Sequence, residues 1–297
     1  MFTTHSTEGP SGRALQYYVA DAQAADDAGV ASPIPLIWLH GSPNVGEPPV
    51  PLYDAAAGHG IGWLGYDRPG YGGSAEFLGR DIASAARDVE AVADALGFGR
   101  FAVMGHSGGG AHALACAALL PDRVGAVVSI AGLAPSTDEG PKRAEKLRIV
   151  EGLRSDDAVV RQEATAGRAA LVTGDELAEF DMDAFFTASD QAALGGKWNW
   201  FNHVVTLGNA NGDGPFVDDE LAAASDWGFD VADIRVPTLI VHGVDDRLVP
   251  VANARWLGAH VPGSQLWLRE DAGHITVLEA AEDALAWVAQ SMAAGQK

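Results

Sequence analysis

Short apolar runs alternate along this chain with segments whose apolar positions recur every three or four residues. The strand-like runs lie at residues 35–40, 60–66, 101–104, 124–130, 237–242 and 265–269. The first four runs are typical of strands buried on both faces. An earlier alternating run at residues 14–20 predicts a further strand or hairpin, and residues 21–31 are predicted to form a turn.

Amphipathic helices are predicted between these strands. In residues 81–96 the apolar side chains fall three or four positions apart, with acids and arginines between them, and Gly97 ends the pattern. Similar segments predict helices at residues 52–57, 108–120, 251–260 and 275–293. Strands that alternate with helices require a mostly parallel central sheet flanked by helices, so the fold class is predicted to be α/β.

The alternation stops between residues 134 and 230. This acidic stretch contains helix-like segments and no comparable buried strand. Long irregular loops are uncommon in compact domains. We therefore predict an inserted helical cap, or lid, at residues 134–230, with a core domain formed by residues 1–133 and 231–297.

Composition and charge narrow the range of functions. The 297 residues are 47% hydrophobic and 20% charged, which suits one large globular domain or a domain with an insertion. A formal net charge of −21 would repel phosphate backbones and anionic membranes, so we expect no nucleic-acid or membrane partner. The N-terminal segment does not have the pattern of a signal peptide, and no apolar run reaches membrane-spanning length. We therefore expect a cytoplasmic protein, either a monomer or a homodimer.

One stretch carries a specific chemical signal: Gly105-His106-Ser107-Gly108-Gly109 follows a predicted strand and precedes an alanine-rich helix. The pattern G-x-S-x-G in this setting exposes a serine hydroxyl at a sharp turn. Small residues two positions before and after the serine let the strand and the helix approach each other. The N-terminus of the helix also directs unpaired N–H groups at the charge that develops during attack. We therefore predict that Ser107 is a nucleophile.

Two later loops carry a candidate acid and a candidate base. Asp245 and Asp246 follow the strand predicted at residues 237–242, and His274 follows the strand predicted at residues 265–269. Open parallel sheets place their sites at this end of the strands. Serine, acid and histidine occur in the order found in α/β-hydrolase triads. These observations alone do not decide between the two aspartates.

Together these motifs resemble the α/β-hydrolase fold family, over residues 33–130 and 236–293 of the core. The resemblance implies a serine hydrolase that works through an acyl-enzyme and needs no cofactor. It implies His274 as the base, and the family pattern histidine-glycine-x-x-aspartate followed by valine-proline selects Asp246.

The resemblance also implies an oxyanion hole. One backbone N–H would come from Gly108 and the other from Ser42, since the next residue, Pro43, has no N–H group. His40 is expected to support this loop. The family's glycine-rich loop at residues 67–74 is expected to be structural, with Arg68 making buried hydrogen bonds.

A serine nucleophile argues against the dehalogenases and epoxide hydrolases of the same fold, which attack with a carboxylate. Our main hypothesis is hydrolysis of a carboxylic ester or lactone, with a small molecule as the substrate. One alternative is a proline-type aminopeptidase, although the tryptophan-containing elbow of proline iminopeptidases is missing. The other is a ligand receptor that uses the cap as a lid.

The cap is expected to determine the substrate. The candidate substrate-binding residues are Trp198, Trp200, Phe201 and His106, and Trp227 and Phe229 are further aromatic candidates that would otherwise form the cap core. The acids of the cap would either favour a neutral or cationic substrate or, as is more common, form a solvated face. Cys116 is the only cysteine, and no histidine pair has the spacing of helical metal ligands, so no metal site is expected.

Overall fold

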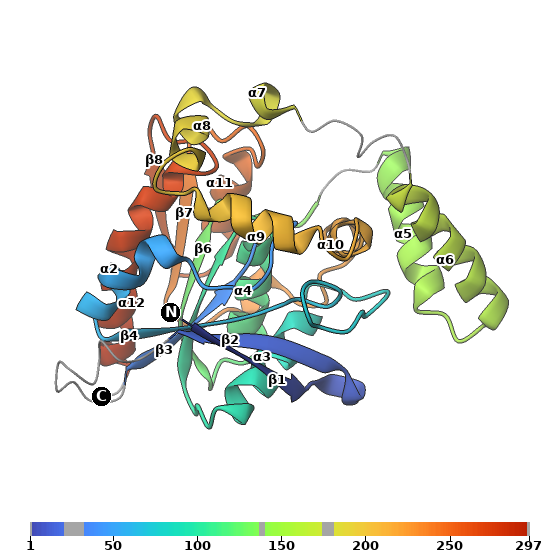
Figure 1. The fold of residues 1–297 in the computed structure, drawn as a ribbon, viewed down its shortest axis with the longest axis horizontal. Helices are drawn as coiled ribbons and strands as arrows, with labels where there is room; N and C mark the ends of the chain where they lie inside the picture. Colours follow the sequence, from blue (N-terminus) through green and yellow to red (C-terminus); the bar gives the residue numbers. More distant parts are fainter. Residues whose placement is uncertain (1, 21–32, 137–139, 174–180, 296–297) are drawn as a thin grey trace.

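The computed structural model describes residues 2–20, 33–136, 140–173 and 181–295, so the turn predicted at residues 21–31 lies outside the described residues. An eight-stranded sheet in the order β1-β2-β4-β3-β5-β6-β7-β8 forms its centre (Figure 1). The strands are β1 (Phe2–Glu8), β2 (Ala14–Ala20), β3 (Ile34–Leu39), β4 (Ile61–Tyr66), β5 (Phe101–His106), β6 (Val124–Ile130), β7 (Thr238–Gly243) and β8 (Gln265–Arg269). Strands β1 and β2 form an antiparallel hairpin, β2 pairs antiparallel with β4, and the other pairs are parallel. The prediction of a mostly parallel sheet is confirmed.

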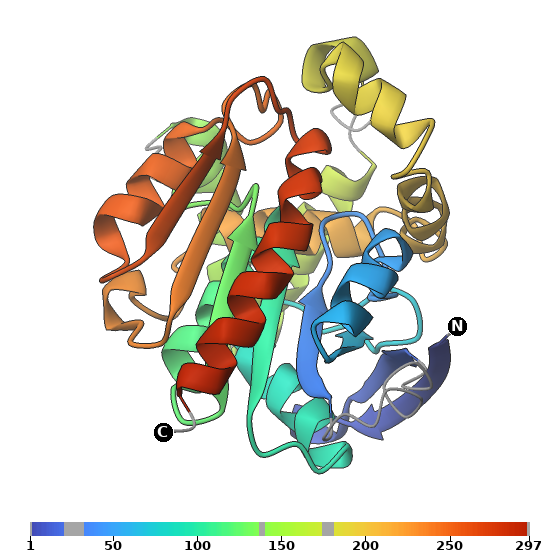
Figure 2. The ribbon, with the colours of Figure 1, turned by 90° about the vertical axis from the view of Figure 1, so that its left-hand side faces the viewer.

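Helices cover both faces of the sheet because side chains alternate along each buried strand. In β3, Ile37 and Leu39 belong to one apolar cluster, whereas Leu36 and Trp38 belong to the cluster on the opposite face. The first cluster is covered by α3 (Ser84–Ala95), α4 (Gly108–Leu119) and α11 (Ala252–His260). The second is covered by α2 (Tyr53–Gly58) and α12 (Ala281–Ala294), and Figure 2 shows α12 lying across the strands.

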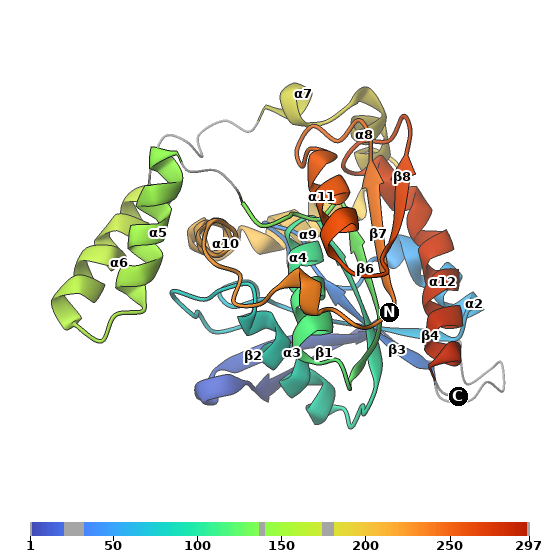
Figure 3. The same cartoon turned by 180° about the vertical axis from the view of Figure 1, so that it is seen from behind.

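Between β6 and β7 the described chain forms helices and no strand. We call residues 134–230 the inserted segment. Its helices are α5 (Pro141–Leu153), α6 (Ala158–Val172), α7 (Met182–Phe185), α8 (Ala188–Leu194), α9 (Trp200–Gly208) and α10 (Gly214–Ala224). The α5–α6 hairpin projects to one side of the molecule (Figures 1 and 3), and it packs on α10 through a small apolar cluster that includes Leu153 and Leu221.

The inserted segment also contributes to the main core. Phe201 and Val204 of α9 belong to the same apolar cluster as Trp38 of β3. The helices of this segment fit a cap, but the division of the chain into two domains stays a prediction.

Two predicted helices differ from the observed ones at their first turn. The helix predicted from residue 81 begins at Ser84 with Ala83 as its N-cap, and the Asp81 carboxylate accepts a hydrogen bond from the Ser84 amide at 2.8 Å in the turn that precedes it. The helix predicted from residue 275 is a 3-10 turn, η5 (Thr276–Ala280), followed by α12. Within the described ranges, no helix combines the length and the apolar composition needed to cross a bilayer.

Substitution at Gly105 tests how tightly β5 and α4 approach. A Cβ atom at this position would lie 2.1 Å from the Gly109 carbonyl oxygen. We expect Gly105→Ala to lower the free energy of unfolding by more than about 3 kcal/mol in urea denaturation, because backbone atoms cannot move aside. Gly58→Ala, at the end of α2 where a Cβ would contact nothing within 4 Å, is the matched control. It should be neutral or stabilising by up to about 1 kcal/mol, and equal losses in both variants would contradict the prediction.

Candidate active site

Ser107 lies at the turn between β5 and α4 in a strained backbone conformation. Its φ of 56° and ψ of −129° fall in a region that L-residues rarely adopt. Two glycines make the turn possible, since a Cβ on Gly105 would collide with Gly109 and a Cβ on Gly109 would lie 1.9 Å from the Leu39 carbonyl oxygen. The serine side chain remains partly exposed at the end of the strand.

His274 and Asp246 form a buried pair. The His274 Nδ1 lies 2.8 Å from the Asp246 Oδ2, while the other carboxylate oxygen of Asp246 accepts hydrogen bonds from the amides of Leu248 and Val249 at 3.0 and 2.8 Å. Both side chains are buried, whereas Asp245 is exposed. A carboxylate acceptor requires Nδ1 to donate, which leaves Nε2 of a neutral ring as an acceptor. The structure therefore brings Asp246, and not Asp245, to His274.

His106 joins the serine turn to the histidine loop. Its Nε2 lies 3.0 Å from the His274 carbonyl oxygen, and the two ring centroids are 4.8 Å apart. Burial lowers the pKa of His106 to about 3, so the ring is neutral near pH 7 and Nε2 donates its single proton to this carbonyl. The neighbour of Ser107 thus holds the backbone of His274 at the turn.

The loop after β3 lies against the serine turn. A Cβ on Gly41 would lie 3.2 Å from the Ser107 Cβ, and a Cβ on Gly108 would lie 3.3 Å from the Ser42 Oγ. Within the part of the chain that the structure describes, the amides of Ser42 and Gly108 donate to no acceptor. Unpaired amides beside a nucleophile are suited to bind an oxyanion.

His40 holds this loop through hydrogen bonds at both ring nitrogens. Its Nδ1 donates to the Gly41 carbonyl at 2.7 Å and its Nε2 accepts from the Arg68 amide at 3.0 Å, which requires a neutral ring. Burial lowers the pKa of His40 well below its ordinary value, with a further contribution from Arg68, and so favours that form. The geometry agrees with the supporting role predicted for His40.

A buried ion-pair cluster connects the same loop to the inserted segment. Asp219 of α10 accepts hydrogen bonds from Arg68 and Arg80, each at 2.7 Å, from the Tyr71 hydroxyl at 2.9 Å and from the Ser42 hydroxyl. Burial alone would raise the pKa of Asp219, but Arg68 and Arg80 outweigh it and hold the pKa well below its ordinary value. Asp219 is therefore ionised, and its charge fixes the Ser42 side chain beside Gly108.

The interpretation of the acids as a solvated face does not hold for two acids of the inserted segment. Asp218 and Asp219 are only 3% and 6% exposed. Asp218 pairs with Arg168 of α6 at 2.8 Å, so it links α10 to the α5–α6 hairpin. The sequence around Asp218 and Asp219 contains no pattern that indicates buried arginine partners far away in the chain.

The aromatic candidates divide into two groups. The Phe201 ring lies 5.5 Å from the His106 ring, and Trp200 packs on Phe201 at 4.9 Å. Trp198 is fully buried and donates from Nε1 to Glu279 at 3.0 Å, so its side chain belongs to the core and not to a substrate pocket. Sequence reasoning missed Phe186, whose ring centroid lies 6.4 Å from that of His274.

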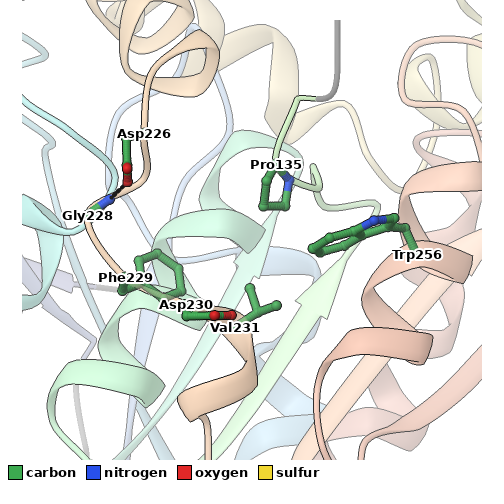
Figure 4. A pocket seen from close by; sticks show the side chains of 7 residues that line it. All are labelled: Pro135, Asp226, Gly228, Phe229, Asp230, Val231 and Trp256. Carbon is green, nitrogen blue, oxygen red and sulfur yellow. Dashed lines mark hydrogen bonds between the residues drawn. The ribbon is translucent and has the colours of Figure 1, made fainter.

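Trp227 and Phe229 lie away from the serine turn. Trp227 is buried in the apolar cluster beneath α3 and α4. Phe229 lines a cavity of about 650 Å³ together with Pro135, Val231 and Trp256 (Figure 4). This cavity contains neither Ser107 nor His274 in its lining, so the interpretation of Trp227 and Phe229 as substrate-pocket residues is not supported.

No group of three or more His, Cys, Asp or Glu side chains in the described ranges is arranged to hold a metal ion. The buried histidines near the site instead have protein partners. His242, for example, places its Nε2 2.8 Å from the Val249 carbonyl oxygen.

Comparison with known proteins identifies the family. A family model described as the alpha/beta hydrolase fold matches residues 34–281. The chain is 31% identical to a non-heme haloperoxidase of Rhodococcus erythropolis over 195 residues, which cover 64% of this chain and 67% of that protein. It is 39% identical over 64 residues to a pimeloyl-[acyl-carrier protein] methyl ester esterase of Aromatoleum aromaticum, a match that covers 22% of this chain and 26% of the esterase.

A solved structure agrees with this assignment at the level of the fold. The enol-lactonase from Burkholderia xenovorans LB400 superposes with a TM-score of 0.67 at 18% identity, covering 97% of this chain and all of that structure. The chain therefore belongs to the α/β-hydrolase fold family, and its relatives support its assignment as a hydrolase.

The buried histidines predict how stability depends on pH. Burial, with a smaller effect of Arg68, lowers the pKa of His112 from 6.5 to about 3. Below pH 6.5 the unfolded state therefore binds more protons, and stability is lost as the pH falls from 6.5 toward 3. His112→Asn keeps a donor for the Gly108 carbonyl, which accepts from Nδ1 at 2.8 Å, but does not titrate. Between pH 7 and pH 5 we expect this variant to lose about 2 kcal/mol less free energy of unfolding than the wild type.

Urea denaturation of both proteins at the two pH values checks this prediction. Groups such as Asp67, whose pKa burial raises to about 6, titrate in both proteins and cancel in the comparison. Equal losses of stability in the variant and the wild type would show that His112 is not held neutral.

Removing the charge of Asp219 tests the ion-pair cluster. Asp219→Asn leaves the buried Arg68 without a carboxylate partner and leaves Arg80 only Asp218, at 3.7 Å, so we expect a loss of about 3–5 kcal/mol in the free energy of unfolding. Glu282→Gln, which breaks an exposed pair with Lys197 at 2.8 Å, should change it by less than about 1 kcal/mol. A similarly small change for Asp219→Asn in urea denaturation would contradict a charged, buried cluster.

Proposed function

We propose that the protein hydrolyses a carboxylic ester or lactone of a small molecule through an acyl-enzyme, with Ser107, His274 and Asp246 as a catalytic triad. The observation that supports this most directly is the buried pair of His274 and Asp246 at 2.8 Å, held at the serine turn by His106. The strained conformation of Ser107 supports its role as nucleophile, because such strain persists where the surrounding structure requires it.

In this mechanism the Ser107 oxygen attacks the substrate carbonyl carbon while His274 Nε2 takes the hydroxyl proton. The carbonyl oxygen becomes an oxyanion that accepts hydrogen bonds from the amides of Ser42 and Gly108. His274 then gives its proton to the leaving alkoxide oxygen as the carbon–oxygen bond breaks. In a lactone the alkoxide stays attached to the acyl group.

Water completes the cycle. His274 takes a proton from a water molecule, whose oxygen attacks the acyl carbon of the ester at Ser107. The second oxyanion binds to the same two amides, and its collapse returns the proton to the Ser107 oxygen and releases the acid. Asp246 stabilises the imidazolium form of His274 in both halves without taking up a proton itself.

The inserted segment would serve as the cap and contribute to the substrate pocket. The Phe201 ring lies beside His106, Trp200 packs on Phe201, and Phe186 lies near His274. An apolar wall of this kind suits an uncharged acyl or alcohol group. The 39% identity to a methyl ester esterase over 64 residues agrees with an ester substrate.

The aminopeptidase alternative has less support. An aminopeptidase needs a free carboxylate to bind the ammonium group of its substrate. Asp218 and Asp219, the buried acids of α10, are already paired with Arg168, Arg68 and Arg80. The receptor alternative keeps the same triad and uses the cap as a lid, and recovery of an intact ligand after cap closure would support it.

Turnover of p-nitrophenyl acetate and butyrate tests the proposal. We expect Ser107→Ala to lose at least about 10⁴-fold in kcat/KM, and Asp246→Asn to lose about 10³- to 10⁴-fold, because the ring of His274 loses its orienting acceptor. The matched control is Ser6→Ala on the exposed face of β1, which should equal the wild type. Equal ester turnover in wild type and Ser107→Ala would refute the proposal, and faster release from aminoacyl-p-nitroanilides than from esters would favour the aminopeptidase.

A further inference from the structure

A buried carboxylate from the inserted segment binds the loop that carries His274. Asp190 lies in the first turn of α8 and is fully buried. Its Oδ1 accepts hydrogen bonds from the amides of Ile275 and Thr276, at 3.0 and 2.8 Å, and from the Thr276 hydroxyl at 2.9 Å. Its Oδ2 accepts from the amides of His274 and Thr187 at 3.2 and 3.1 Å. Four of these five contacts cross from the inserted segment to the histidine loop.

The loop is shaped to fit this carboxylate. A Cβ on Gly273 would lie 1.9 Å from the Asp190 Oδ2, so only glycine leaves room for it. The Thr276 hydroxyl donates to Asp190 and at the same time accepts from the Gly273 amide at 2.8 Å. The amides of residues 274–276 therefore donate directly to Asp190, and the amide of Gly273 is linked to it through the Thr276 hydroxyl.

The carboxylate is stabilised in its charged form by these donors. Burial alone would raise the pKa of Asp190, but the hydrogen bonds from Thr276 and Thr187 outweigh it and lower the pKa. No lysine or arginine of the described ranges forms an ion pair with Asp190. Its charge is therefore balanced by backbone amides of the histidine loop and of α8, and not by a cation.

We propose that Asp190 is a positioning residue for catalysis, through which the inserted segment fixes the backbone of His274; this inference rests on the proposed function. The imidazole is then held at two points, at Nδ1 by Asp246 and at its own amide by Asp190. Without Asp190 the amides of residues 274–276 would be buried without acceptors, which is unfavourable, so the loop would move to find others.

Small displacements of the base matter for turnover. A misplacement of about 1 Å can cost about 100-fold in rate even when it originates outside the reacting groups. The inserted segment would thus do more than contact substrate, since catalysis would depend on α8 remaining docked on the core.

Asp190→Asn is the most selective test. The Asn oxygen can keep the contacts to Ile275 and Thr276, while its NH₂ group replaces the oxygen that accepts from the His274 amide. We expect kcat per active site to fall about 10- to 100-fold with KM changing less than about 3-fold. Active sites are titrated with a fluorophosphonate that reacts with Ser107, so unfolded protein does not enter the turnover number.

The matched control is another capping aspartate of the inserted segment. Asp157 at the start of α6 accepts from the amides of Val159 and Val160 at 2.8 and 3.3 Å, but it is exposed and does not contact the histidine loop. Asp157→Asn should leave kcat per titrated site unchanged. Thr276→Val is a milder second variant, which removes one donor to Asp190; we expect a loss of about 3- to 10-fold, so the test stands even if Asp190→Asn does not fold.

The outcomes separate this inference from the proposed function. If Asp190→Asn and Thr276→Val only lower the melting temperature or the number of titrated sites, with kcat per site within 2-fold of the wild type, then Asp190 is merely structural and the inference is wrong. If the wild type reacts with the fluorophosphonate but cleaves no ester or lactone, the proposed substrate class is wrong, and the rate constant of Ser107 labelling replaces kcat as the readout. A wild type that neither turns over nor is labelled refutes both.

Discussion

The site depends on the close approach of three backbone segments at Ser107. The first turn of α4 contacts the end of β3, as shown by the 1.9 Å that would separate a Gly109 Cβ from the Leu39 carbonyl oxygen. Because β3 and β5 are neighbours in the sheet, the loop that follows β3 must then lie beside the serine. One packing constraint on the backbone therefore places Ser107 and the amides of Ser42 and Gly108 together.

Three buried carboxylates hold His274 and Ser42 in place, and each carboxylate accepts hydrogen bonds from a different set of donors. Asp246 binds the His274 ring, and Asp190 binds the backbone of the same residue. Asp219 binds Ser42 and two arginines. Two of these three acids belong to the inserted segment, so the loops on both sides of Ser107 are fixed by helices that lie outside the alternating strand–helix pattern.

Much of this arrangement was predictable from the sequence, because it is encoded locally. The strands, the glycines around Ser107 and the chain order of Ser107, Asp246 and His274 are patterns within a few residues, and the topology of a parallel sheet brings them to one edge. The choice of Asp246 required the family pattern, and the structure brings the same residue to His274.

The contacts of the inserted segment could not be predicted in this way. Asp190 is 84 residues away from His274 in the sequence, and Asp219 is 177 residues away from Ser42. The pattern Thr187-x-x-Asp190 is typical of a helix start, and the structure has a capping box there, but nothing in the pattern indicates that the same carboxylate binds another loop. Trp198 and Phe201 also look alike in sequence. Both are buried in the same apolar cluster, and only the packing places Phe201 against the His106 ring.

The pairing of the buried charges limits which substrates the site can bind. The chain has 40 acids and 19 lysines and arginines, so buried cations are scarce. The two arginines nearest the Ser42 loop, Arg68 and Arg80, already share Asp219 and do not offer a free charge to a ligand. Besides its partner Asp246, His274 has as neighbours the neutral ring of His106 and the aromatic ring of Phe186. Since an unpaired carboxylate on a substrate would find no compensating cation among these groups, the arrangement favours a substrate whose acyl portion is uncharged near the reacting carbonyl.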